Sequence, residues 1–576
     1  MSTVAEPAAP SATTSEPGAR RDRRSPSTGL KRIGTWVFVG VLAYLVFGPL
    51  VRLQLQAFGD GARGYSLAFG SSRIGEVVLT TVYLALGSLA IGMVMGTLLA
   101  WWAVRLPRGC GWMRLLPVLP IIVPAIASVV GWAFLLSPRP GFLNAALRRL
   151  PWWSGLSEGP IDVYSTFWIV VIVGIALSSF VYLFVSSGFA NINGELIEAA
   201  YVSGSSPLAT FFKVILPLLR PALIYGAGVA LLLALGQFTA PLLLGSNGGV
   251  HVLTTEMYRE IANFPIEYGV AAALGSPLLV FGILVVVGQR VLLGDQRRFI
   301  THGSKAFRGG WKPSWGAAAG VLGYFVLSTL LPLLALSAVA LQPFWSGSFD
   351  VGTATFDNFR QVLATPGITG AIVNSLVVSA LAVLIALPVG FVAATLLLRR
   401  GAGRVARAVL DFVIAAPLGI PAVLFGVGFL LTYTQAPLQL YGTRWILVLV
   451  YVTLMLPFAT RMQLAALMSL GNAYEEASRT SGAGLLRTKA RIVLPLLRPA
   501  LAGAAALMFV LLTHEFTASV LVRAPFQQVM GTVLYDYWQN GSYPTVAAIA
   551  LVMSGVTTVG VGTALAFGGS DSLSRM

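Results

Sequence analysis

The chain carries the same polar stretch twice, and the two copies lie 278 residues apart. The first copy opens with Glu198-Ala199-Ala200 and the second with Glu476-Ala477-Ser478, and each contains the eight-residue string LPLLRPAL. The register continues without a gap as far as Gln237 in the first copy and Glu515 in the second. A match of this length is typical of a duplicated structural unit. The chain is therefore expected to fold as two related halves.

Glycine and proline divide each copy at the same places. Gly204 and Gly482 follow the opening triplets, and Leu216-Pro217 and Leu494-Pro495 come later in the two copies. Glycine readily takes the backbone conformation that ends a helix, and proline is favoured near the start of one. Each copy thus predicts two short helices separated by a glycine turn, followed by the start of a longer helix.

The composition around the repeats is that of an integral membrane protein. Of the 576 residues, 56% are hydrophobic and only 10% are charged, and the mean hydropathy is +0.81. A helix crosses the bilayer core with about 20 apolar residues, and the sequence contains roughly twelve runs of that length. These runs are too long and too uniformly apolar for the alternating strands of a membrane barrel. We expect an all-α membrane protein with about twelve transmembrane helices.

The apolar runs divide into six spans in each half. The expected spans are 33–53, 77–104, 112–136, 165–188, 217–245 and 268–293, then 315–341, 372–398, 407–433, 444–468, 499–523 and 544–567. The expected domains are a disordered basic tail (1–32), a first half (33–295, core 77–290, polar loop 194–216), a linker (296–314), a second half (315–567, core 370–565, polar loop 472–494) and a C-terminal tail (568–576).

Charge placement predicts the orientation. A cytoplasmic N-terminus puts 28 of the 38 Lys and Arg residues on the cytoplasmic side, which agrees with the positive-inside rule. Both polar loops then face the cytoplasm, because an even number of spans separates them. Two six-helix halves in the same orientation form a parallel repeat about an axis along the membrane normal. Two equivalent loops on one face are suited to docking two copies of a soluble partner.

The loops resemble the signature of a known family. The pattern EAA, three residues, G, nine residues, I, one residue and LP is that of the MetI-like permeases of type I ABC importers. Val214 replaces the isoleucine of the first copy, and Ser478 replaces the last alanine of the second. The resemblance implies that each loop is a coupling loop that transmits closure of a nucleotide-binding subunit to the membrane helices. The residues to which it assigns this role are Glu198, Ala199, Ala200, Gly204, Leu216, Pro217, Glu476, Ala477, Ser478, Gly482, Leu494 and Pro495.

The chain lacks residues for chemistry of its own. None of its lysines lies in a G-K-[ST] phosphate-binding context. The single Cys110 and three scattered histidines suggest neither redox nor metal chemistry. We expect no catalytic residue, no bound cofactor and no nucleic-acid partner. The resemblance implies a cytoplasmic ATPase homodimer that binds ATP and Mg²⁺, an extracytoplasmic solute-binding protein, and residence in the bacterial inner membrane.

Polar residues within the spans are few. Glu515 and its first-half equivalent Gln237 are the clearest, and an intramembrane carboxylate suggests a functional role. The position of Glu515 in its span predicts a place in the outer part of the membrane. We regard both residues as candidates for the translocation path or its gate, and a purely structural role for Glu515 as the alternative. Tyr258 and Tyr535, in outer segments, are interpreted as interfacial aromatics or as contacts for a binding protein.

The solute is the least determined part of the hypothesis. The fused two-half layout and the segments GFLN, VLTTEMY and EFTASVLV look most like the ferric-iron permeases. Thiamine, polyamine and phosphonate permeases share much of this pattern and stay as alternatives. A secondary transporter with six plus six helices and a membrane scaffold without transport activity are the alternatives from other classes.

Overall fold

A computed structural model describes residues 26–190, 192, 194–293, 313–398, 403–471 and 473–568. The predicted tail up to residue 25, nearly all of the predicted linker and the end of the C-terminal tail lie outside the described residues. The described part is built from helices and connecting turns, with no β-strand in it. Nine of its helices are long and apolar enough to cross a membrane, or up to twelve spans if each bent pair counts as one. The predicted all-α membrane fold is confirmed.

The helices follow the duplicated pattern. In the first half they are α1 (Pro26–Gly70), α2 (Ile74–Val104), α3 (Leu119–Ile122), α4 (Ala125–Leu136), α5 (Phe142–Leu147), α6 (Thr166–Ala190), α7 (Gly194–Val202), α8 (Pro207–Thr210), α9 (Leu216–Leu218), α10 (Arg220–Leu235), α11 (Ser246–Gly248), α12 (Leu253–Ala262) and α13 (Tyr268–Leu293). In the second half they are α14 (Trp315–Phe325), α15 (Leu331–Ala340), α16 (Asp357–Ala364), α17 (Pro366–Leu398), α18 (Arg404–Gly419), α19 (Ala422–Tyr433), α20 (Arg444–Leu470), α21 (Ala473–Thr480), α22 (Leu485–Thr488), α23 (Leu494–Thr513), α24 (Ser519–Val522), α25 (Met530–Gln539) and α26 (Tyr543–Gly568).

Two spans expected to be continuous are broken in the middle. The span predicted at 112–136 bends by 93° between Ile122 and Ala125, and the span predicted at 407–433 bends by 108° between Gly419 and Ala422. The residues before Pro124 and Pro421 have extended backbone, because a following proline disfavours the helical conformation. The prolines therefore divide both spans at the same place in the repeat.

The spans that follow the polar loops also differ from expectation. The helix predicted at 217–245 ends at Leu235, and the helix predicted at 499–523 ends at Thr513. In both halves a short irregular segment follows, which contains Gln237 or Glu515, and then a further short helical segment. Sequence hydropathy could not reveal these breaks, because the residues beyond them are again apolar.

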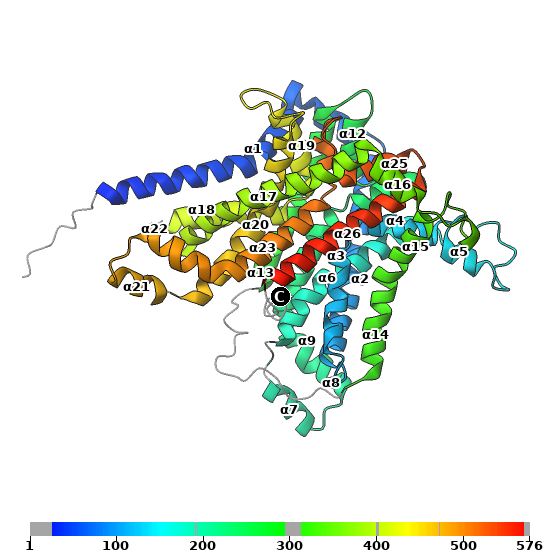
Figure 1. The fold of residues 1–576 in the computed structure, drawn as a ribbon, viewed down its shortest axis with the longest axis horizontal. Coiled ribbons are helices and arrows are strands. Elements are labelled where there is room, and N and C mark those ends of the chain that lie inside the picture. Colours follow the sequence, from blue (N-terminus) through cyan, green and yellow to red (C-terminus); the bar gives the residue numbers. More distant parts are fainter. Residues whose placement is uncertain are drawn as a thin grey trace, which may run out of the picture.

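The two halves are interlocked. α1 packs against α13 of its own half and against α18 and α19 of the other half, and α15 packs against α26 of its own half and α4 of the other (Figure 1). Equivalent contacts recur inside each half. The Thr81 hydroxyl accepts the Leu253 backbone N–H at 3.0 Å, and the equivalent Ser375 hydroxyl accepts the Met530 N–H at 2.8 Å. Helices α1 and α15 thus join the two halves, and the same hydrogen bond repeats within each half.

Close crossings of the long helices fix the register of the repeat. A Cβ atom added to Gly96 of α2 would lie 2.6 Å from the Cβ of Val181 in α6. A Cβ atom added to Gly390 of α17 would lie 2.8 Å from the Cβ of Ala459 in α20. These glycines let the two helix pairs approach at equivalent points. They align α2 with α17 and α6 with α20 residue by residue.

Candidate functional site

The two coupling loops lie at the same end of the molecule. Figure 1 shows α21 at the left and α7 at the bottom of the helical bundle, whereas α12 and α25 lie at its top and upper right. The predicted coupling residues occupy equivalent places in the two loops. Glu198, Ala199 and Ala200 lie in α7 and Leu216 and Pro217 in α9, while Glu476, Ala477 and Ser478 lie in α21 and Leu494 and Pro495 begin α23.

Each coupling helix ends in the same glycine turn. Gly204 has φ +81° and Gly482 has φ +80°, in the left-handed region that other residues avoid. The N–H of Ser205 bonds the carbonyl of Ala200, five residues earlier, and the N–H of Gly204 bonds that of Tyr201. The second loop has the same pair of bonds at equivalent positions. This pattern is the Schellman motif, which satisfies the free carbonyl groups at a helix end, so the predicted glycine turn is present in both loops.

The loops differ in one buried hydrogen bond. The hydroxyl of Ser478 in α21 lies 2.8 Å from that of Thr488, and both side chains are buried. The first loop has Ala200 in place of Ser478, and the equivalent Thr210 is fully buried. The Thr210 hydroxyl has no hydrogen-bond partner among the described residues. Ser478, which departs from the family pattern, therefore gives the buried Thr488 hydroxyl a hydrogen-bond partner in the second loop.

This difference gives a prediction about stability. Replacing Ala200 by serine supplies the missing partner of Thr210 and is expected to stabilise the first loop by about 0.5–1.5 kcal/mol. The midpoint of heat unfolding of the purified chain should rise, and Ser478→Ala should lower it. Ala199→Ser is the matched control, because Ala199 is exposed. An equal rise in the Ala199→Ser variant would contradict this explanation.

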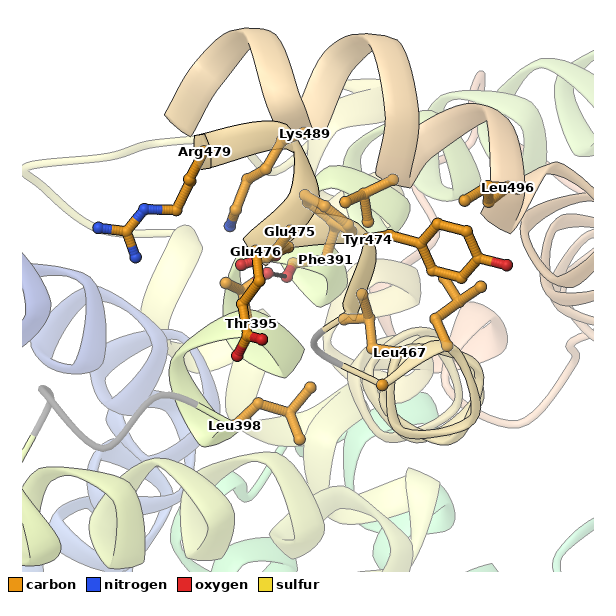
Figure 2. Close-up of a pocket in the computed structure, with 13 residues that line it drawn as sticks. Phe391, Thr395, Leu398, Leu467, Tyr474, Glu475, Glu476, Arg479, Lys489 and Leu496 are labelled. Atoms are coloured by element: carbon orange, nitrogen blue, oxygen red, sulfur yellow. Dashed lines mark hydrogen bonds between the residues drawn. The ribbon is translucent and has the colours of Figure 1, made fainter. Parts of the chain in front are cut away.

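A pocket of about 670 Å³ lies beneath the second coupling helix. Figure 2 shows its walls, which come from the ends of α17 and α20, from α21 and from the segment that carries Lys489. The Lys489 ammonium lies 5.3 Å from the centre of the Phe391 ring, and the Arg479 side chain points away from the pocket. The pocket therefore combines an apolar wall with the charged residues of the coupling loop.

At the other end of the molecule, Glu515 caps a helix. Its carboxylate accepts the backbone N–H groups of Ala518 at 2.8 Å and Ser519 at 3.0 Å, and the Ser519 hydroxyl at 2.6 Å. These contacts hold the start of α24, where backbone N–H groups have no partner within the helix. At the equivalent position, it is the backbone carbonyl of Gln237 that accepts the Thr254 hydroxyl at 2.6 Å. The geometry favours the structural role for Glu515, as a helix cap.

The capping role predicts unequal effects of two substitutions. Glu515→Ala removes both side-chain acceptors and is expected to cost about 1–2 kcal/mol of stability. Glu515→Gln keeps one side-chain oxygen and should lose less than half of the stability that the alanine variant loses. Heat unfolding of the purified variants measures both effects. If the two variants unfold alike, the cap does not account for this residue.

The aromatic residues that follow Gln237 and Glu515 meet between the two halves. The rings of Phe238 and Phe516, which are equivalent in the repeat, have centroids 5.8 Å apart, and those of Tyr258 and Tyr535 are 6.1 Å apart. Each phenylalanine also packs on the tyrosine of its own half, at 5.7 Å in both cases. Equivalent residues can touch only near the axis that relates the halves. We call these four residues the aromatic seal.

The sequence did not predict this seal. Tyr258 and Tyr535 were interpreted as interfacial aromatics or contacts for a binding protein, and both pack against the phenylalanines at the axis. The only sequence signal was that Phe238 and Phe516 follow Gln237 and Glu515 at the same repeat position. Among the described residues, no group of three or more His, Cys, Asp or Glu side chains is placed to hold a metal ion.

The fold and site define a class of protein: a duplicated helical membrane protein with two equivalent polar loops at one end. The profile of the binding-protein-dependent transport system inner membrane component family matches residues 63–298 and 386–566. The chain belongs to this family and carries its domain twice. It is thus a permease of the ABC importer type and a multi-pass inner-membrane protein.

Individual relatives carry more specific names. The ferric transport system permease protein FbpB of Actinobacillus pleuropneumoniae is 24% identical over 89% of this chain and 74% of its own length. A putative ferric transport system permease protein FbpB 1 of Haemophilus influenzae is 25% identical over 82% of this chain and 74% of its own. A putative 2-aminoethylphosphonate permease protein PhnV of Salmonella paratyphi A is 30% identical over 43% of this chain and 92% of its own.

Proposed function

We propose that this chain forms the complete translocation path of an ATP-driven importer for ferric iron. The observation that carries the proposal is the pair of equivalent coupling loops, each closed by the same glycine turn, at one end of a duplicated permease fold. Two of the relatives that match most of the chain are named as ferric transport permeases, which supports iron as the solute, whereas a third is named only as a probable ABC transporter permease. The match to a phosphonate permease covers less than half of the chain and keeps that alternative open.

The coupling loops are proposed to dock two identical ATPase subunits in the cytoplasm. The N-terminus then lies on the cytoplasmic side, as the positive-inside rule favours. ATP and Mg²⁺ are bound by those subunits, since this chain has no phosphate-binding motif. An extracytoplasmic binding protein delivers the solute to the other end. Closure of the ATPase dimer moves α7 and α21 and shifts the halves between two states.

The aromatic seal is proposed as the outer gate. Its four rings lie on the axis between the halves and pack against one another, and a hydrophobic constriction blocks water and ions. Glu515 acts as a positioning residue, because it caps α24 directly beyond Phe516. Gln237 has the same place beside Phe238 in the first half. Movement of the halves would separate equivalent rings and open the path.

Transport by reconstituted components tests the proposal. The chain is placed in liposomes with its ATPase subunits and solute-binding protein, and uptake of radioactive ferric iron is measured. Uptake should require ATP and the binding protein and should be insensitive to a proton ionophore. Uptake driven by a proton gradient without the ATPase would establish a secondary transporter instead. Uptake of thiamine, a polyamine or a phosphonate, but not of iron, would correct the solute alone.

A further inference from the structure

Different side chains lie beneath the two coupling helices, α7 and α21. Beneath α7, Trp101 of α2 packs on Phe211 with ring centroids 4.6 Å apart and on Phe189 of α6 at 6.1 Å. Ile197 of α7 is fully buried, and the Arg105 guanidinium covers the Trp101 ring at 5.3 Å. Aromatic side chains therefore pack α2, α6 and the Phe211 segment against one another, and α7 lies against that segment.

The same positions in the second half hold smaller or charged residues. The register set by the glycine crossings aligns Trp101 with Thr395, Phe189 with Leu467, Phe211 with Lys489 and Ile197 with Glu475. All four second-half residues line the pocket beneath α21, and Figure 2 shows the open space between them. The pocket is thus the space that the aromatic cluster fills in the first half.

The membrane helices that follow the loops differ as well. The identical string LPLLRPAL is bent by 70° at Leu219 in the first half, whereas in the second half it begins α23, which runs unbroken to Thr513. A Cβ atom added to Gly188 would lie 2.7 Å from the Cβ of Ala222. The second half has Ala466 at the position of Gly188, so its methyl group would obstruct the same close approach.

These differences have a mechanical consequence. Close-packed side chains transmit displacement directly, because the interior of a protein is nearly incompressible. Side chains around a pocket can move into it before they press on their neighbours. A displacement of α7 is therefore transmitted directly to α2 and α6. A displacement of α21 first moves side chains into the pocket, and only then presses on α17 and α20.

We propose that the two coupling loops transmit ATPase closure unequally, with α7 as a rigid lever and α21 as a compliant one. The inference rests on the proposed docking of ATPase subunits at both loops. The subunits are identical, so the inequality arises in this chain. The first half is the main route of transmission, and the second half follows after its pocket has closed.

Hydrogen exchange of the full chain in nanodiscs, alone and with its ATPase subunits, tests the inference. In the chain alone, backbone amides of α21 should exchange about tenfold faster than those of α7, since local opening follows local packing. The double substitution Thr395→Trp with Lys489→Phe copies the first-half cluster and should slow the exchange of α21. The reverse pair, Trp101→Thr with Phe211→Lys, should speed that of α7 and abolish most solute-stimulated ATP hydrolysis.

The outcomes separate the two proposals. Equal exchange of α7 and α21, or a filled pocket that leaves exchange of α21 unchanged, overturns the unequal levers while docking stands. Failure of the ATPase to protect either loop from exchange overturns docking and the levers together. Trp101→Phe keeps an aromatic ring and should retain solute-stimulated hydrolysis. If Trp101→Phe loses hydrolysis to the same extent as the Trp101→Thr pair, filling of this space is not what transmits the motion.

Discussion

Gly204→Val is expected to reduce ATP-driven uptake to about a tenth or less of the wild-type rate, because a β-branched residue does not tolerate left-handed backbone. A Cβ atom at Gly204 would meet nothing within 4 Å, so the whole effect comes from backbone strain of about 1–3 kcal/mol. The strain would open the glycine turn and move α7 from its docking position. Uptake and solute-stimulated ATP hydrolysis in proteoliposomes measure the loss.

Two further variants make this test specific. Gly40→Val adds the same side chain to a helical glycine of α1 that also has open space around it, and it should transport normally. Gly204→Asn should be milder than valine, because asparagine is among the few residues that enter the left-handed region. Normal uptake by Gly204→Val at wild-type membrane levels would show that the turn is not needed for coupling.

Removal of both phenylalanine rings of the aromatic seal is expected to open the outer end without ATP. The double variant Phe238→Ala with Phe516→Ala should raise the sodium chloride conductance of planar bilayers at least about tenfold, since a hydrophobic constriction that is widened fills with water. The wild-type chain should stay silent under the same conditions. ATP-driven accumulation should fall, because solute leaks back through the open path.

The seal variant needs a control for lost core packing. Phe134 is fully buried and packs on Trp345 and Tyr543, in an aromatic cluster apart from the seal. Phe134→Ala removes a ring of the same size and should destabilise the chain without raising conductance. Conductance at the wild-type level in a folded Phe238→Ala with Phe516→Ala variant would remove the seal from the proposed mechanism.

The sequence predicted the features that repeat within short segments. Gly204 and Gly482 were expected to end helices, because glycine alone enters the left-handed region without strain, and both do. The breaks at Pro124 and Pro421 could also have been predicted from the sequence, since the residue before a proline disfavours the helical backbone conformation. The matched prolines were instead interpreted as part of straight spans.

Features formed by residues from distant segments could not be predicted from the sequence. The aromatic seal joins Phe238 with Phe516, which lie 278 residues apart in the sequence, and their meeting depends on how the halves pack. The role of Glu515 depends on where α23 ends, and hydropathy does not mark that point. The pocket beneath α21 arises from differences between the halves at four positions, which lie on separate helical segments. The effect of these differences can be inferred only when the structure shows which residues of the two halves are equivalent.

The central claim is that this chain couples two ATPase subunits through its two loops. Native mass spectrometry of the complex, purified through the chain and released from detergent, measures the stoichiometry directly. The proposal predicts two ATPase subunits per chain for the wild type, and a weakened complex when both Gly204 and Gly482 are replaced by valine. A chain that binds no ATPase subunit, or binds two equally well after both glycines are replaced, would contradict it.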